Sequence, residues 1–236
     1  MSAGFPSPPQ PPPNGPTGKR ARPFGRLAVD LYVFVERSIF ETDSQWLGAL
    51  SLLSGLEVEG LAIQVRTRGE APLRGFALAR EARAATEGAA VPVLLNGLTE
   101  TALELGYEGV HWSEVLIPER NEKRELLHGA SVHSPQAVAK AETAGADFVV
   151  AGTVFNAGSK PVPGAGLEAL RRMADSTQLP VLAIGGVTPE RVASCIAAGA
   201  AGVAVVTSVL RAPDMAVAIQ ELRCAVDEAK LAGSPC

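Results

Sequence analysis

Short apolar runs alternate with helix-patterned segments along almost the whole of this 236-residue chain. Such runs are typical of strands that are buried on both faces, as in parallel sheets. The expected strands cover 27–35, 60–65, 91–95, 109–112, 127–132, 148–154, 181–184 and 202–206. Helical patterns lie at 43–53, 73–85, from 99, and at 135–144, 166–174, 189–198 and 213–231, and Thr99 suits the N-cap of the third of these helices. This alternation predicts an α/β fold, a single (β/α)8 TIM barrel, with a doubly wound open sheet as the alternative.

The junction from helix to strand repeats in one form at three places. Gly106, Gly145 and Gly199 each stand at the end of a helix-patterned segment, shortly before the next apolar run. Glycine adopts the left-handed conformation that ends many helices without the steric cost of a side chain. The repeat therefore supports the alternation of helices and strands.

The first 25 residues differ from the rest in composition. Seven prolines lie between Pro6 and Pro16, interspersed with Ser, Gly and Gln. Such a segment cannot bury enough apolar surface to form a packed element. We therefore expect a disordered proline-rich tail over 1–25 and one barrel domain over 26–231.

Charge and composition narrow the classes of partner. The net charge is -4 and the body of the chain has no basic block, which argues against nucleic acid as a partner. No apolar run is long enough to span a membrane, and the N-terminus has no apolar signal-peptide core. Cys195, Cys224 and Cys236 lack the spacing of a zinc site or a disulfide framework. We expect a cytoplasmic protein; its oligomeric state stays open, a homo-oligomer included.

In a barrel of this kind the active site lies at the carboxyl ends of the strands, so polar residues there are candidates. After the second to fifth strands they are Gln64, Arg66, Arg68, Asn96, His111, Ser113, Glu114, Ser131 and His133. After the sixth to eighth strands they are Thr153, Asn156, Ser159, Lys160, Gly185, Gly186, Thr207 and Ser208. These positions place charged and hydrogen-bonding groups on one rim.

A phosphate site is expected where Gly185 and Gly186 connect a buried strand to a helix. Thr188 would cap this helix and Pro189 would begin it. Unpaired N–H groups and the positive end of the helix dipole meet at such a turn, and glycines let a phosphate approach. Phosphate binding after the seventh and eighth strands recurs in this fold, which brings in Thr207. A turn that binds nothing is the alternative.

Some of these polar residues are candidates for proton transfer or for neutralising the charge of a ligand. His133 directly follows an expected strand, and an imidazole with a pKa of about 6.5 exchanges protons near neutral pH. The alternative is a hydrogen-bonded rim residue. We interpret His111, which lies beside Trp112, as packed and structural. Arg66 and Lys160 offer cations for a phosphate or carboxylate group.

Seven short segments, taken in order, form a pattern from about residue 27 to residue 225. They are Leu31–Phe34, Gln64–Arg66, Leu94–Asn96, Gly109–His111, Gly129–Ser134, Gly145–Val149 with Gly152–Phe155 and Ser159–Pro161, and Ala183–Val187 with Gly202–Val206. Together they resemble the thiamine phosphate synthase/TenI superfamily. The resemblance implies a TIM barrel that binds a phosphorylated thiazole, with the phosphate on Gly185 and Gly186 and near Thr207.

By this resemblance, a synthase would join a pyrimidine pyrophosphate to the thiazole. It would hold the pyrophosphate with Mg²⁺ through a Gln-x-Arg-x-Lys segment, an Asn-Asp pair and an Asp after the fourth strand. In this chain the first segment, Gln64–Arg68, reads Gln-Val-Arg-Thr-Arg, so an arginine keeps the positive charge of the expected lysine. The two expected aspartates are absent, because the Asn-Asp pair reads Asn96–Gly97 and Val115 stands where the Asp after the fourth strand is expected. Because Mg²⁺ prefers carboxylate and phosphate oxygens, these departures should weaken its site. Glu114 is the alternative ligand.

The TenI branch resembles this chain and, by that resemblance, is a thiazole tautomerase that needs no metal. Its catalytic imidazole lies in a motif similar to Ser131-Val-His133. We therefore predict a thiazole tautomerase without cofactor, in which His133 is the general acid and base. Ser131 and Ser159 would orient the substrate, and Lys160 and Arg66 would neutralise its charge. The alternatives are a Mg²⁺-dependent thiamine phosphate synthase and a non-catalytic thiazole phosphate-binding regulatory barrel.

Overall fold

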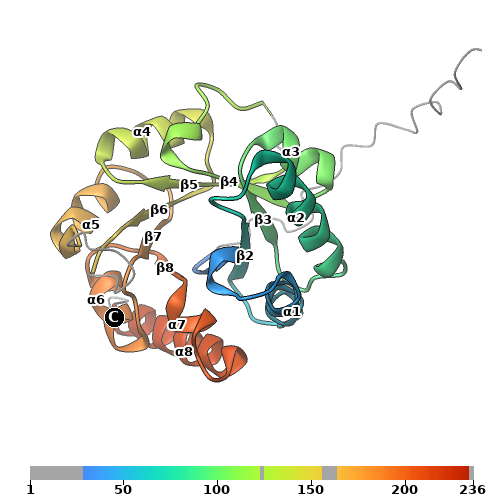
Figure 1. Cartoon of the computed structure of the whole chain (residues 1–236). Coiled ribbons are helices and arrows are strands. Elements are labelled where there is room, and N and C mark those ends of the chain that lie inside the picture. Colours follow the sequence, from blue (N-terminus) through green and yellow to red (C-terminus); the bar gives the residue numbers. More distant parts are fainter. Residues whose placement is uncertain (1–28, 123–124, 156–163, 234–236) are drawn as a thin grey trace, which may run out of the picture.

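A computed structural model describes residues 29–122, 125–155 and 164–233. Eight parallel strands form a closed barrel in sequence order, and the helices surround it (Figure 1). The strands are β1 (Leu31–Glu36), β2 (Leu61–Arg66), β3 (Val93–Asn96), β4 (Gly109–Trp112), β5 (Leu127–Val132), β6 (Phe148–Gly152), β7 (Val181–Ile184) and β8 (Gly202–Val205). The predicted TIM barrel is confirmed. The open sheet is wrong, because β1 pairs with β8.

The helices follow the predicted alternation, with three short additions that the sequence pattern did not indicate. The long helices are α1 (Asp43–Ser54), α2 (Pro72–Ala85), α3 (Thr99–Leu105), α4 (Pro135–Ala144), α5 (Gly166–Ala174), α6 (Pro189–Ala197) and α8 (Met215–Gly233). The additions are η1 (Arg37–Ile39), η2 (Glu114–Leu116) and α7 (Thr207–Leu210). All three follow the carboxyl end of a strand, so they lie on the side of the barrel where the candidate site is expected. None of the helices that the structure describes has the length and apolarity needed to cross a membrane.

Two apolar cores explain why the strands are apolar at nearly every position. Successive side chains of a strand point to opposite faces. On β1, Tyr32 and Phe34 belong to a cluster with Phe148, whereas Leu31 and Val33 belong to the larger cluster that includes the helices. Each strand therefore supplies apolar side chains to the barrel interior and to the layer beneath the helices.

Two strands begin two or more residues later than the sequence predicted, and β6 ends at Gly152 rather than at the predicted residue 154; the other boundaries agree to within one residue. β1 begins at Leu31, after Asp30, whose carboxylate is ion-paired with Arg223 and Lys230 of α8. β3 begins after Pro92, which has no N–H group to donate to a neighbouring strand. Residues 27 and 28, the proposed domain boundary at 26 and the proposed disordered tail lie outside the described residues, so those expectations stay predictions.

The predicted glycine junctions are confirmed, and one predicted cap is wrong. The φ angles of Gly106, Gly145 and Gly199 are 74°, 86° and 94°, in the left-handed region that favours glycine. Thr99 is the first residue of α3 rather than its cap. Its hydroxyl oxygen instead accepts a hydrogen bond of 3.1 Å from the indole of Trp112, which ties α3 to β4.

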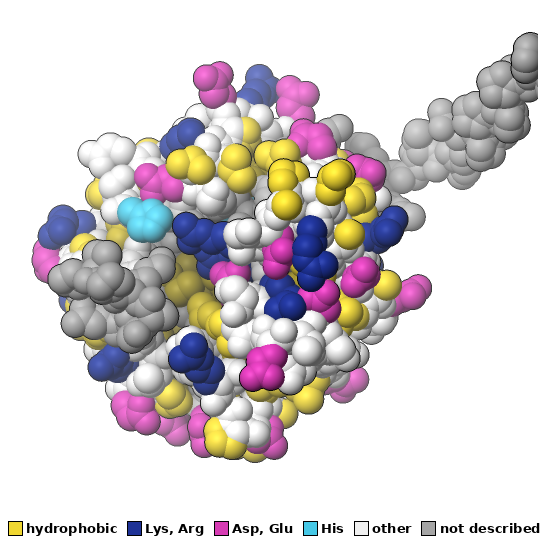
Figure 2. Space-filling view, viewed as in Figure 1, with side chains coloured by type: hydrophobic (Ala, Val, Ile, Leu, Met, Phe, Trp, Pro, Cys, Tyr) yellow, Lys and Arg dark blue, Asp and Glu magenta, His cyan; other side chains and the backbone are white. Residues whose placement is uncertain are grey.

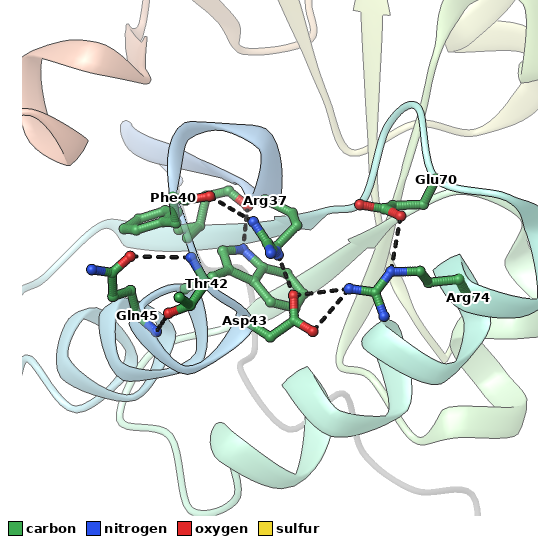
Figure 3. A network of polar contacts seen from close by, with 9 residues as sticks. Arg37, Phe40, Thr42, Asp43, Gln45, Glu70 and Arg74 are labelled. Atoms are coloured by element: carbon green, nitrogen blue, oxygen red, sulfur yellow. Dashed lines mark hydrogen bonds and ion pairs between the residues drawn. The ribbon is translucent and has the colours of Figure 1, made fainter.

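The turn after β1 is fixed by a polar network (Figure 3). Arg37 Nε donates to the Asp43 carboxylate at 2.5 Å, and Arg74 of α2 donates to the same carboxylate at 2.9 and 3.1 Å. Hydrogen bonds from these two arginines lower the pKa of Asp43. The indole of Trp46 on α1 donates to the Val35 carbonyl at 3.1 Å. The end of β1 is thereby joined to the starts of α1 and α2.

Candidate active site

The carboxyl ends of the strands form one mouth of the barrel, and several predicted site residues lie there. Figure 2 shows this face, where Lys and Arg side chains and an exposed histidine border a central hollow. Gln64 and Arg66 lie on β2, and Asn96 ends β3. Ser131 lies on β5, and His133 follows the last residue of that strand. The fold therefore brings residues from three strands to one mouth, as expected.

Below the mouth, polar side chains inside the barrel are surrounded by aromatic rings. His111 Nε2 and Ser131 Oγ form a hydrogen bond of 2.8 Å. Gln64 Nε2 donates to the Tyr32 hydroxyl at 3.5 Å. The rings of Tyr32 and Phe34 lie 5.6 and 5.3 Å from the imidazole of His111, between centroids. We call this group, Tyr32, Phe34, Gln64 and His111, the barrel floor.

The barrel floor is uncharged near neutral pH. Burial, with a smaller contribution from the charge of Arg66, lowers the pKa of His111 to about 3. Burial also raises the pKa of Tyr32 above its usual value. The packed environment predicted for His111 is confirmed, but the imidazole lies inside the barrel and contacts Ser131. It therefore belongs to the site as a neutral hydrogen-bonding group.

Two atoms of the barrel floor are buried without a hydrogen-bond partner among the described residues. They are Gln64 Oε1 and His111 Nδ1. An unsatisfied buried polar atom costs about 1–3 kcal/mol, so proteins rarely keep one without a use. The two atoms are unused hydrogen-bonding capacity in the barrel floor, and both side chains are fully buried. A polar heterocycle is the kind of ligand whose hydrogen-bonding groups match this capacity.

Arg66 provides a cation between the barrel floor and the rim. Its Nε lies 3.2 Å from a carboxylate oxygen of Glu36, and its guanidinium lies 5.7 Å from the centre of the Phe34 ring. Burial lowers the pKa of Arg66, and the charge of Glu36 opposes this effect. A guanidinium stays protonated despite such a shift. Arg66 and the exposed Arg68 nearby can bind an anionic group at the mouth.

His133 is paired with an acid on the rim. Its Nδ1 lies 2.6 Å from Oε2 of Glu114, a residue of η2. Because a carboxylate can only accept, Nδ1 carries the proton, and Nε2 is left as the basic atom of the neutral ring. His133 is 65% exposed and Glu114 is 37% exposed, so the pair faces solvent at the mouth. The arrangement is suited to proton exchange with a bound molecule.

The donor set does not fit a magnesium site. Gly97 has no side chain to offer, and Val115 is an exposed apolar residue. The Asn96 side chain donates to the His111 carbonyl at 3.0 Å. Within residues 29–122, 125–155 and 164–233, no three His, Cys, Asp or Glu side chains lie close enough to hold a metal ion. Glu114, the alternative ligand, is engaged with His133. Mg²⁺ prefers carboxylate oxygens, which this rim does not gather.

The predicted phosphate turn has a backbone that requires glycine. The φ angles of Gly185 and Gly186 are 103° and 63°. A Cβ at Gly185 would also overlap Thr153, which follows β6. Arg191 of α6 donates to the Gly186 carbonyl at 2.7 Å and lies over the Phe155 ring. The turn is therefore fixed on two sides, and both glycines remain partly exposed.

The loops after β7 and β8 are joined to each other. Ser208 Oγ donates to the Val187 carbonyl at 2.7 Å. Thr207–Leu210 forms the short helix α7, the type of extra helix that accompanies phosphate sites in this fold. Thr188 occupies the predicted cap position, but its side chain hydrogen-bonds Glu190, whose pKa it lowers, rather than the backbone. The two predicted parts of the phosphate site, the glycine turn after β7 and Thr207 after β8, therefore lie in loops that contact each other.

The structure does not describe some of the predicted site residues, and sequence reasoning missed others. Ser159, Lys160 and Asn156 lie outside the described residues, so their predicted roles stay predictions. Sequence reasoning missed Tyr32, because its position within an apolar strand gave no sign of a polar contact. It also missed α7, which is too short to produce a periodic pattern.

Comparison with known proteins identifies the family. A family model described as thiamine monophosphate synthase matches residues 33–209. The chain belongs to this family. The thiamine-phosphate synthase of Methanoregula boonei is 35% identical over 211 residues, which are 86% of this chain and 96% of that protein. The thiamine-phosphate synthase of Methanoculleus marisnigri is 35% identical, covering 88% of this chain and all of that protein.

Solved structures agree with this membership. The thiamine phosphate pyrophosphorylase from Pyrococcus furiosus has a TM-score of 0.67 and 28% identity, covering 86% of this chain and 98% of that one. A 3-hexulose-6-phosphate synthase, with a TM-score of 0.61 and 18% identity, shares the fold. The predicted superfamily is confirmed, and the chain is a member of an enzyme family of thiamine biosynthesis. The names of these relatives favour the synthase alternative over the predicted TenI-like branch.

Proposed function

We propose that this protein is a thiamine-phosphate synthase, which joins a pyrimidine pyrophosphate to a thiazole phosphate. In this reaction a carbon–nitrogen bond forms between the rings, and pyrophosphate leaves with the electrons of the broken carbon–oxygen bond. The observation that carries the proposal is the presence of two separate binding features at one mouth. A phosphate turn lies after β7, beside the short helix that follows β8, and side chains of β1, β2 and β4 form a polar barrel floor.

Each feature suits one substrate. The thiazole phosphate would place its phosphate on the Gly185 and Gly186 turn beside α7. The pyrimidine would enter the barrel, where Gln64 and His111 each have a buried atom to satisfy. A thiazole phosphate alone would leave the barrel floor unused. The floor therefore supports a two-substrate reaction over an isomerisation.

The pyrophosphate would be neutralised by side-chain cations. Arg66 and Arg68 lie at the end of β2, directly above the expected place of the pyrimidine ring. Arginine binds phosphate oxygens through two parallel N–H groups, and its charge would stabilise pyrophosphate as it leaves. The described residues of the rim do not gather the carboxylates of a magnesium site, so we assign the chain's own contribution to departure of pyrophosphate to these arginines.

The test is incubation of the purified protein with hydroxymethylpyrimidine pyrophosphate and thiazole phosphate, with thiamine phosphate measured by chromatography. One arm contains Mg²⁺ and the other contains a chelator. The expected result is that thiamine phosphate forms in at least one arm, at a rate proportional to protein concentration. Gln64→Leu should weaken binding of the pyrimidine substrate and leave thiazole phosphate binding unchanged. No product in either arm would overturn the proposal.

A second function is favoured by the pair of His133 and Glu114. An imidazole whose Nδ1 is held by a carboxylate has a defined tautomer, with Nε2 free to accept a proton. Such a base could move a proton between two positions of a bound thiazole, as a tautomerase requires. In this reaction His133 would take a proton from one ring position and return it at another.

The two functions are separated by substitution. If the protein isomerises a carboxythiazole phosphate, His133→Gln should abolish that rate. The same change should leave the coupling reaction largely intact, because His133 follows β5, three strands along the barrel from β2. Tight binding of thiazole phosphate without turnover in either assay would identify the chain as a binding protein instead.

A further inference from the structure

An apolar groove lies on the outer surface between α6 and α8, the two helices seen side by side in Figure 1. Its volume is about 700 Å³. Pro189, Ala216, Val217 and Ala225 contribute its apolar surface, and Val217 is 52% exposed. The exposed thiol of Cys224 also lines it. The groove is separate from the mouth residues that the proposed function uses.

The rim of the groove is acidic. Glu190 of α6 and Glu221 and Glu228 of α8 line it, and no Lys or Arg is among the lining residues that the structure describes. A groove with an apolar surface and carboxylates on its rim is complementary to a segment that carries apolar groups between cations. The charge of the rim excludes an acidic occupant.

The chain itself contains a segment with this composition. Residues 19–26 read Lys-Arg-Ala-Arg-Pro-Phe-Gly-Arg, with four cations around Pro23 and Phe24 and no acid. These residues lie outside the described part of the chain. The described part begins at Val29, and the next residue, Asp30, is ion-paired with Arg223 and Lys230 of α8. The described chain therefore begins beside α8, the helix that forms one wall of the groove.

The lengths of the segment and the groove agree. The lining residues of α8 extend from Ala216 to Glu228, about 18 Å of helix at 1.5 Å per residue. Eight extended residues reach roughly 26 Å, and the three Cα–Cα steps from Arg26 to Val29 add roughly 10 Å. Arg22 precedes a proline, which favours an extended backbone at that position. One pass of the segment along α8 can cover the groove.

Attachment to the same chain favours this occupant over a free partner. A segment joined by a short linker has an effective concentration on the order of millimolar at its site. Weak contacts, such as one buried aromatic ring and a few solvent-exposed ion pairs, then suffice for occupancy. A free peptide of the same sequence would need a much higher affinity.

We propose that residues 19–26 of this chain dock in the groove between α6 and α8, with Phe24 on the apolar surface and the cations against the glutamates. The test uses the full-length chain with Phe24→Cys and Cys236→Ser. Cys224 is exposed and Cys195 is buried, so a short bismaleimide should join residues 24 and 224. Peptide mass mapping identifies the linked pair, and a Ser2→Cys variant in the same background is the matched control.

The expected result is a cross-link within one chain, with a yield at least fivefold above that of the Ser2→Cys control. Glu221→Lys with Glu228→Lys should reduce this yield at least threefold and leave the coupling rate unchanged. Equal yields from positions 2 and 24 would overturn the proposal. So would a yield that the two glutamate changes do not alter. A cross-link between two chains that disappears on dilution would overturn it in favour of a second copy as the occupant.

Discussion

The buried imidazole of His111 predicts a specific dependence of stability on pH. Its pKa is about 3 in the folded protein and about 6.5 when exposed in the unfolded chain. Between these values the unfolded state binds a proton that the folded state does not. The free energy of unfolding therefore falls as the pH drops below about 6.5, by about 1.4 kcal/mol per pH unit. From pH 7.5 to pH 5.0 the loss from this group alone is about 2 kcal/mol.

The measurement is urea-induced unfolding of the wild-type protein and of His111→Gln at these two pH values. Other groups titrate in both proteins, so the difference between their pH slopes isolates the imidazole. The wild type should lose about 2 kcal/mol more than His111→Gln between pH 7.5 and pH 5.0. Ser131→Ala is the matched control. It removes the hydrogen-bond partner and keeps the buried ring, so it should retain most of the wild-type slope.

Parallel pH profiles for the wild type and His111→Gln would refute the reasoning. They would mean that the imidazole is protonated in the folded barrel or is hydrated there. In that case the barrel floor would become charged on mild acidification or would be hydrated, and its assignment to an uncharged polar ring would fail with it.

Three further predictions concern the mouth. Gly185→Ala should bind thiazole phosphate at least roughly tenfold more weakly in calorimetry, because the turn must change shape. Gly106→Ala, with a similar φ but open space around it, should lose only about 1–2 kcal/mol of stability and no affinity. Gln64→Leu should raise the KM for the pyrimidine pyrophosphate about tenfold in steady-state kinetics, and an equal rise for both substrates would contradict its assigned place. Glu114→Gln should slow any tautomerase activity roughly tenfold to a hundredfold without changing coupling, since it acts through His133. Equal loss of both activities would contradict that assignment.

The fold could be predicted because each strand must supply two apolar cores, which leaves an unbroken apolar run in the sequence. The left-handed φ angles at Gly106 and Gly145 were predictable for a similar reason, since few other residues adopt them. Positions at strand ends also followed from the barrel, which is why Arg66 and Ser131 were found. These features depend on local sequence and on one general property of the fold.

Pairings across the barrel could not be predicted in this way. His111 was interpreted as structural because its neighbours in sequence are apolar, whereas its chemical neighbours come from β1, β2 and β5. The contact between Glu114 and His133 joins residues 19 positions apart through η2, which has no sequence pattern. The register between neighbouring strands decides which side chains make such contacts, and no single segment of the sequence determines the register of a parallel barrel.

Charge is distributed unevenly between the inside of the barrel and its mouth. The barrel floor holds a neutral imidazole and a neutral phenol, whereas Arg66, His133 and the phosphate turn lie toward solvent. Moving a phosphate from the rim to the floor would strip its hydration without offering a cation, at a cost far above that of moving a neutral ring. Both proposed substrates carry a ring at one end and phosphate at the other. Desolvation alone would therefore orient each with its phosphate outward, so that the thiazole ring meets the pyrimidine ring above the barrel floor, where the new bond must form.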